Sequence, residues 1–80
     1  INARIFDGDI VYIRQQDTVE NGEIAVVRID DEATLKKVNF DGTTMVLQPL
    51  NPAYPLMTYT GAALADVHIE GKAVGLCRGL

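Results

Sequence analysis

Short turn signals placed between short apolar runs constrain the fold of this chain more than any other feature. Each of the three signals pairs a glycine with Asp or Asn: Asp7-Gly8-Asp9, Asn21-Gly22 and Asp41-Gly42. Such pairs supply the positive φ that tight turns require. The apolar runs at 10–13, 24–29 and 33–40 are rich in Val, Ile, Thr and Phe and are short for helices. The spacing therefore predicts antiparallel β-strands joined by tight turns.

The order of these runs predicts a meander. The run at 24–29 is apolar on both faces except for Arg28, which favours a central position in a sheet. The run at 33–40 turns at Asp41-Gly42 into a strand at 43–47. A polar loop at 17–20 precedes the second strand, and acidic residues 30–32 connect it to the third.

The second half of the chain is less regular. Residues 49–55 contain all three prolines, which cannot donate ladder hydrogen bonds, so we expect an extended surface crossing. Residues 61–66 favour a short helical turn. Residues 67–70 and 72–78 predict a final strand, or a pair of strands, interrupted at Gly71. The predicted fold class is all-β: one domain over residues 1–80, forming a strongly coiled antiparallel sheet or a partly open barrel.

Size and charge restrict the functions that remain. Eighty residues with 48% hydrophobic content can form a core, but a chain this short buries only roughly 60–65% of its unfolded surface. A partner or an attached segment would therefore add to its stability. The net charge of −4 argues against binding to a phosphate backbone, and no apolar run is long enough to span a membrane. The single cysteine, Cys77, excludes an internal disulfide and suits a cytoplasmic protein.

Lys36 is a charged residue on the apolar face of its predicted strand. Alternation places Lys36 on the same face as Val38 and Phe40, whereas Lys37 shares the other face with Asn39. A lysine facing an apolar layer either extends its ammonium to water or loses its proton easily and acts as a base. Strand alternation by itself favours the first interpretation.

A nucleophile for such a base is missing, because the chain contains no serine. The hydroxyls of Thr34, Thr43 and Thr44 could lie nearby, but threonine in a sheet is usually explained by its β-propensity. His68 and Cys77 are too few for a zinc site, which needs about four ligands. On a continuous strand they would also face opposite ways, so we interpret them as a surface histidine and a small core cysteine.

The acidic and glycine-rich segments do not predict a bound ion or nucleotide. Asp7, Asp9 and the acidic run at 30–32 lack the spacing of a calcium loop, and turn capping explains them better. Gly71 and Gly75 lack the spacing of a phosphate-binding loop. We therefore expect no metal and no cofactor.

Several segments in order resemble the C-terminal domain of the S24 self-cleaving peptidases, the family of LexA, the phage CI-type repressors and the mutagenesis protein UmuD. The resemblance begins at Asp7-Gly8-Asp9 and Asn21-Gly22, and the stretch Arg28–Lys37 is similar to the signature around the family's catalytic lysine. The tract 47–55 is similar to the phage-repressor form, and residues 69–76 resemble the closing strand. Together these segments cover nearly the whole chain.

The resemblance implies a Ser–Lys dyad in which Lys36 is the general base. The dyad would cleave the protein's own linker between a DNA-binding domain and this domain, stimulated by an activated RecA filament in the SOS response. The family's serine lies in a Ser-Met pair that we expect just before Ile1. The 80 residues alone should then be inactive, with the DNA-binding domain absent as well.

The resemblance leaves two functions open. The first is the dimerisation and self-cleavage domain of a prophage repressor. The alternative is a non-enzymatic dimerisation module of a UmuD-like polymerase accessory protein. In either case we expect a homodimer formed through the edge of the C-terminal strand at 74–78, with DNA bound only through the absent domain and no membrane partner. A free-standing β-barrel binding module is a more distant possibility.

Overall fold

The structure is a computed structural model that describes residues 2–6 and 8–77, with side chains described from Gly8 to Cys77. Its elements in order are β1 (Asn2–Phe6), β2 (Asp9–Gln15), β3 (Glu23–Ile29), β4 (Glu32–Phe40), β5 (Thr44–Pro49), β6 (Met57–Thr60), the 3₁₀ helix η1 (Gly61–Asp66) and β7 (Val67–Cys77). Within these ranges the strands form one sheet of seven in the order β1-β2-β7-β3-β4-β5-β6, with every pair antiparallel. The all-β prediction is confirmed.

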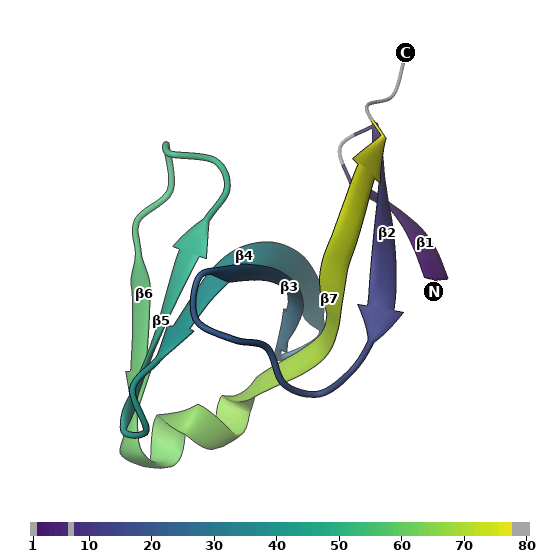
Figure 1. Ribbon diagram of the computed structural model, residues 1–80. Coiled ribbons are helices and arrows are strands. Elements are labelled where there is room, and N and C mark those ends of the chain that lie inside the picture. Colours follow the sequence, from purple (N-terminus) through teal and green to yellow (C-terminus); the bar gives the residue numbers. More distant parts are fainter. Residues whose placement is uncertain (1, 7, 78–80) are drawn as a thin grey trace.

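The sheet is strongly coiled and does not close into a barrel. In Figure 1, β5 and β6 stand on one side, β7, β2 and β1 stand on the other, and the curved β3 and β4 connect them. Two irregularities in β7 contribute to this shape. One residue of β7, Glu70, has no counterpart in β3, and Val74 has none in β2. Such bulges bend a strand and increase its twist.

The core lies on both faces of the central strand β3, as its apolar sequence predicts. One buried cluster consists of Ala25, Val27, Val38 and Leu47, and the other consists of Val11, Ile13 and Val26. Because side chains alternate along β3, Val26 packs in the second cluster, whereas Ala25 and Val27 pack in the first. Because β3 pairs with β4 on one side and β7 on the other, its predicted central position is confirmed.

The predicted glycine turns are confirmed where the structure describes them. Gly22 and Gly42 have φ values of 86° and 100°, which side chains other than glycine rarely adopt. The Asp41 carboxylate accepts hydrogen bonds from the Thr43 and Thr44 backbone N–H groups at 2.9 and 2.8 Å. Donation by these N–H groups, with Thr43 first, lowers the pKa of Asp41. Asp7, part of the first predicted turn, lies outside the described residues.

The structure corrects the expectation for the proline tract. The proline tract is not a surface crossing: Pro49 ends β5, and the exposed loop after it leads into β6, which returns to pair with β5. The pairing between β5 and β6 ends at Leu47, so the backbone N–H that Pro49 lacks is not required for a hydrogen bond to β6. Neither β6 nor β1 was expected from the sequence. The helical turn at 61–66, in contrast, is confirmed as η1.

The final strand is continuous through Gly71, which the sequence marked as an interruption. Gly71 is buried between Val26 of β3 and Gln15 of β2. A Cβ at this position would lie 2.7 Å from the Arg14 carbonyl oxygen, closer than real Cβ atoms approach. The glycine is therefore needed for close contact between β7 and β2.

Candidate functional site

Lys36 lies on β4 with its side chain on the face of the first core cluster. It pairs with Ala25 of β3 and with Pro49 of β5, and the next residue on its face, Val38, is buried opposite Leu47. The Lys36 side chain is half-buried, whereas Lys37 on the other face is exposed. The strand alternation inferred from the sequence is therefore confirmed for Lys36.

Lys36 opens into a small pocket with a volume of about 180 Å³. The pocket is lined by residues from β3, the turn that follows it, β4 and the start of β6: Ile29, Asp30, Glu32, Thr34, Lys36 and Met57. We call this cavity the Lys36 pocket. Glu32, Thr34 and Lys36 alternate along β4, so they share one face. Ile29 packs against the first core cluster, so the pocket adjoins the core.

The Lys36 amine has no ion-pair partner among the described residues. The two ion pairs in that part of the chain join Arg28 to Glu70 and Lys72 to Glu23. A half-buried amine that faces a pocket and is not held by a carboxylate is free to exchange a proton with a group that enters. This is the chemistry expected of a general base.

Only one of the three threonines considered from the sequence shares this pocket. Thr34 lies two residues from Lys36 on the same face and lines the cavity. Thr43 and Thr44 lie at the β4–β5 turn, where the carboxylate of Asp41 accepts their hydrogen bonds. Lys36 pairs near the other end of the same hairpin, so these two hydroxyls are remote from its amine. The structure brings none of the three into hydrogen bonding with Lys36.

The acidic residues that the sequence assigned to turn capping contribute to the pocket as well. Asp30 and Glu32 line it, although their spacing along the chain gave no indication of a site. The signal was available in principle, because Glu32 has the same strand parity as Lys36. Among the described residues, no group of three or more His, Cys, Asp or Glu side chains is arranged to hold a metal ion.

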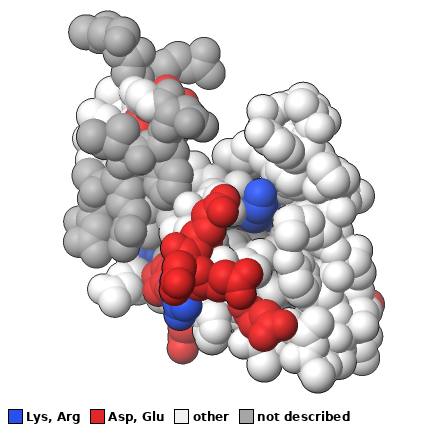
Figure 2. Space-filling view, turned by 180° about the vertical axis from the view of Figure 1, so that it is seen from behind, with Lys and Arg blue, Asp and Glu red and all other residues white. Residues whose placement is uncertain are grey.

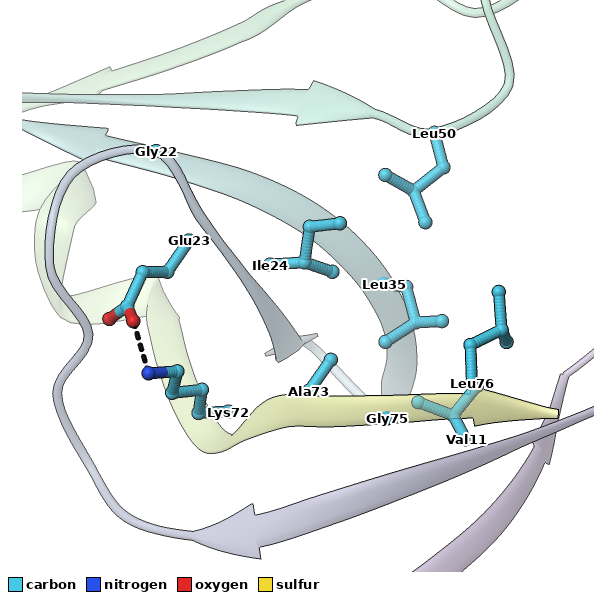
Figure 3. Close-up of a pocket in the computed structure, with 10 residues that line it drawn as sticks. All are labelled: Val11, Gly22, Glu23, Ile24, Leu35, Leu50, Lys72, Ala73, Gly75 and Leu76. Atoms are coloured by element: carbon cyan, nitrogen blue, oxygen red, sulfur yellow. Dashed lines mark ion pairs between the residues drawn. The ribbon is translucent and has the colours of Figure 1, made fainter.

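A second, larger cavity lies beside β7 and was not foreseen. It has a volume of about 400 Å³, and its apolar walls come mainly from five residues: Val11, Ile24, Leu35, Leu50 and Leu76. Figure 3 shows these side chains around the cavity, with the ion pair between Glu23 and Lys72 toward one end. We call it the apolar groove. A hydrogen bond from Lys72, followed by one from the Glu20 backbone N–H at 2.7 Å, lowers the pKa of Glu23.

His68 and Cys77 both lie on β7 with exposed side chains. The interpretation of His68 as a surface residue is confirmed, and that of Cys77 as a core residue is wrong. Pairing between β7 and β3 ends at Lys72, so β3 does not cover the end of β7 that carries Cys77.

The described surface seen in Figure 2 shows acidic side chains gathered together, with basic side chains beside them. None of the helices described is long and apolar enough to cross a membrane.

The fold and the lysine pocket together fit one class of protein. The model of the Peptidase S24-like family matches residues 1–74, and the chain belongs to this family. It is similar to the LexA repressor of Herpetosiphon aurantiacus, with 42% identity over 82 residues, covering 100% of this chain and 37% of that protein. It is also similar to the LexA repressor of Ruegeria sp., with 43% identity over 79 residues, covering 98% of this chain and 32% of that protein. The chain thus spans about a third of the length of these relatives and is a LexA-type S24 domain.

Proposed function

We propose that Lys36 is the general base of a Ser–Lys self-cleavage site in the C-terminal domain of a LexA-like repressor. The observation that carries this proposal is the half-buried, unpaired amine of Lys36 at a pocket in an S24-family domain. The 80 residues contain no serine, so the nucleophile must come from a segment outside them. The substrate would be the linker between this domain and a DNA-binding domain, in a repressor of phage type.

The reaction needs the serine hydroxyl, the Lys36 amine and one water molecule. The neutral Lys36 amine accepts the proton of the serine hydroxyl while the serine oxygen bonds to the carbonyl carbon of the linker peptide. The resulting ammonium returns that proton to the leaving amine nitrogen as the peptide bond breaks. A water molecule then attacks the ester carbonyl while Lys36 accepts one of its protons, and the ammonium returns that proton to the serine oxygen as the ester bond breaks. An activated RecA filament would favour the conformation in which the linker reaches the pocket.

The proposal is tested with a protein extended upstream until it contains the Ser-Met pair and the linker. Purified protein is incubated at neutral and alkaline pH, and the fragments are identified by mass spectrometry. We expect one cut in the linker, formed faster at alkaline pH because only the neutral amine can accept a proton. A serine-to-alanine variant should be stable. Absence of a Ser-Met pair from the upstream sequence would refute the peptidase assignment.

A second function, dimerisation, is supported by the free edge of β7. From Ala73 to Cys77 this strand pairs only with β2, so its other edge lacks a partner strand within the described chain. The apolar groove lies along this edge, and Leu76 is 62% exposed beside it. A second copy that added its β7 to the edge would pair both backbones and cover Leu76. Sedimentation at micromolar concentrations tests this, because a strictly monomeric protein would contradict it. A UmuD-like accessory protein would use the same surface.

A further inference from the structure

The loop between β2 and β3 is joined to the end of β4 by two hydrogen bonds. The Phe40 backbone N–H donates to Oδ1 of Asn21 at 2.6 Å, and the Gly22 backbone N–H donates to the Val38 carbonyl oxygen at 2.9 Å. The paired residues of β3 and β4 begin only at Glu23, opposite Val38. The two bonds therefore extend this pairing into the loop, with the Asn21 side chain in place of a backbone carbonyl. We call these two hydrogen bonds the loop clasp.

Asparagine followed by glycine is chemically labile, because the glycine has no side chain to hinder attack by its backbone nitrogen. The Gly22 nitrogen can bond to Cγ of Asn21, and its proton leaves with the side-chain nitrogen as ammonia, which gives a cyclic imide. Water then adds to one of the imide carbonyl carbons, the bond from that carbon to the Gly22 nitrogen breaks, and a proton returns to the nitrogen. Breakage at Cγ gives aspartate, whereas breakage at the backbone carbon gives isoaspartate, whose main chain runs through Cγ.

The loop clasp restrains both reacting groups. The Gly22 nitrogen must lose the proton that it donates to Val38, and Cγ of Asn21 must turn toward that nitrogen while its oxygen is bound to Phe40. Asn21 and Gly22 are both exposed, so water reaches them and the hydrogen bonds, rather than burial, oppose the reaction. The clasp must therefore open before the imide can form, just as local opening precedes the exchange of a hydrogen-bonded amide proton.

We propose that Asn21 is a deamidation site that the loop clasp protects, so that it is converted only in molecules whose loop has opened. The site adjoins the apolar groove, because Gly22 and Glu23 line that cavity (Figure 3). Isoaspartate at position 21 adds one main-chain atom just before these two residues and moves the Gly22 N–H away from the Val38 carbonyl. Aspartate at the same position leaves the main chain unchanged and keeps an oxygen that accepts from Phe40. Isoaspartate therefore breaks the clasp, whereas aspartate preserves it.

The test follows deamidation of the 80-residue chain in mildly alkaline buffer, which favours loss of the Gly22 proton. Peptide mass spectrometry measures the conversion of residue 21 in the folded chain and in the same chain unfolded in urea. Amide hydrogen exchange at Gly22, read by nuclear magnetic resonance, gives the fraction of folded molecules whose clasp is open. The variant Phe40→Pro removes the N–H that donates to Asn21. Its matched control, Phe40→Ala, removes the same partly exposed ring but keeps that N–H.

We expect deamidation to be at least about tenfold slower in the folded chain than in urea, because both hydrogen bonds of the clasp must open first. This slowing should agree with the open fraction from hydrogen exchange within about threefold, since one opening controls both reactions. Phe40→Pro should deamidate about 2–10 times faster than Phe40→Ala, the effect of losing one hydrogen bond. The isolated isoaspartate product should unfold at a lower urea concentration than the Asn21→Asp variant.

Equal deamidation rates in the folded chain and in urea would overturn the proposal. Slow deamidation that bears no relation to exchange at Gly22 would overturn it as well, because protection would then not come from the clasp. If Phe40→Pro does not fold, the agreement between deamidation and exchange in the parent chain still decides the question. Equal unfolding midpoints for the isoaspartate product and Asn21→Asp would contradict the loss of the clasp in isoaspartate.

Discussion

Replacing Gly71 with alanine should destabilise the domain far more than the same change at Gly75. The added methyl at Gly71 would lie 2.7 Å from the Arg14 carbonyl oxygen, with β2 and β3 paired on its two sides. Relief of this contact requires the backbone to shift, and overpacking of this kind costs about 1–3 kcal/mol. The reduced freedom of the unfolded chain offsets about 0.4–1 kcal/mol of that cost. We expect a net loss of about 1–2 kcal/mol, a large share of the roughly 4–12 kcal/mol expected for 80 residues.

Gly75→Ala is the matched control on the same strand. Its new methyl would meet the Tyr12 ring at 3.5 Å, an ordinary van der Waals distance, so its stability should change by less than about 0.5 kcal/mol. Urea unfolding followed by far-ultraviolet circular dichroism measures both. With a slope of about 1 kcal/mol per molar urea, Gly71→Ala should lower the midpoint by about 1–2 M. Equal midpoints for the two variants would refute the reasoning that close contact with β2 requires glycine at position 71.

Two further predictions concern the turns and the apolar groove. Hydrogen bonds from Thr43 and Thr44 lower the pKa of Asp41 in the folded protein. The ionised carboxylate therefore stabilises the fold at pH values above the pKa of aspartate in the unfolded chain. This stabilisation is lost as the pH falls through the pKa of Asp41 in the folded protein. Asp41→Ala should therefore lower the melting temperature at pH 7 and much less at pH 2, and a difference that did not shrink in acid would contradict this. Leu76→Asp should shift the sedimentation equilibrium toward monomer, whereas Leu56→Asp, at a similarly exposed leucine outside the groove, should not. An equal effect of both would exclude the groove as the dimer surface.

Local sequence rules predicted the features that neighbouring residues decide. Glycines at 22 and 42 indicated the turns, the apolar run of β3 indicated its central position, and alternation placed Lys36 on the core face. The rules missed β6, a short strand after the proline tract that pairs with β5 and, among the described strands, with no other. Gly71 was misread as a break because its reason is a contact with β2, which local sequence does not reveal.

The candidate site, too, combines features that local sequence predicts with features that depend on how the strands come together. Alternation and family resemblance singled out Lys36, but the pocket around it forms only when β3, β4 and β6 come together. Asp30 and Glu32 were interpreted as turn residues, although Glu32 shares strand parity with Lys36 and could have been placed on the same face. The apolar groove depends on where pairing between β3 and β7 stops, which the sequence does not specify. The exposed position of Cys77 has the same cause.

The rate of self-cleavage in the upstream-extended protein tests the central claim most directly. It is measured across a pH series for the parent, for Lys36→Ala and for Lys37→Ala, the exposed neighbour on the opposite face of β4. Loss of a general base lowers a rate by about 10²–10⁴-fold, so Lys36→Ala should cleave at least about a hundred times more slowly at every pH, while Lys37→Ala follows the parent. Cleavage by Lys36→Ala at the parent rate would show that Lys36 is not the base.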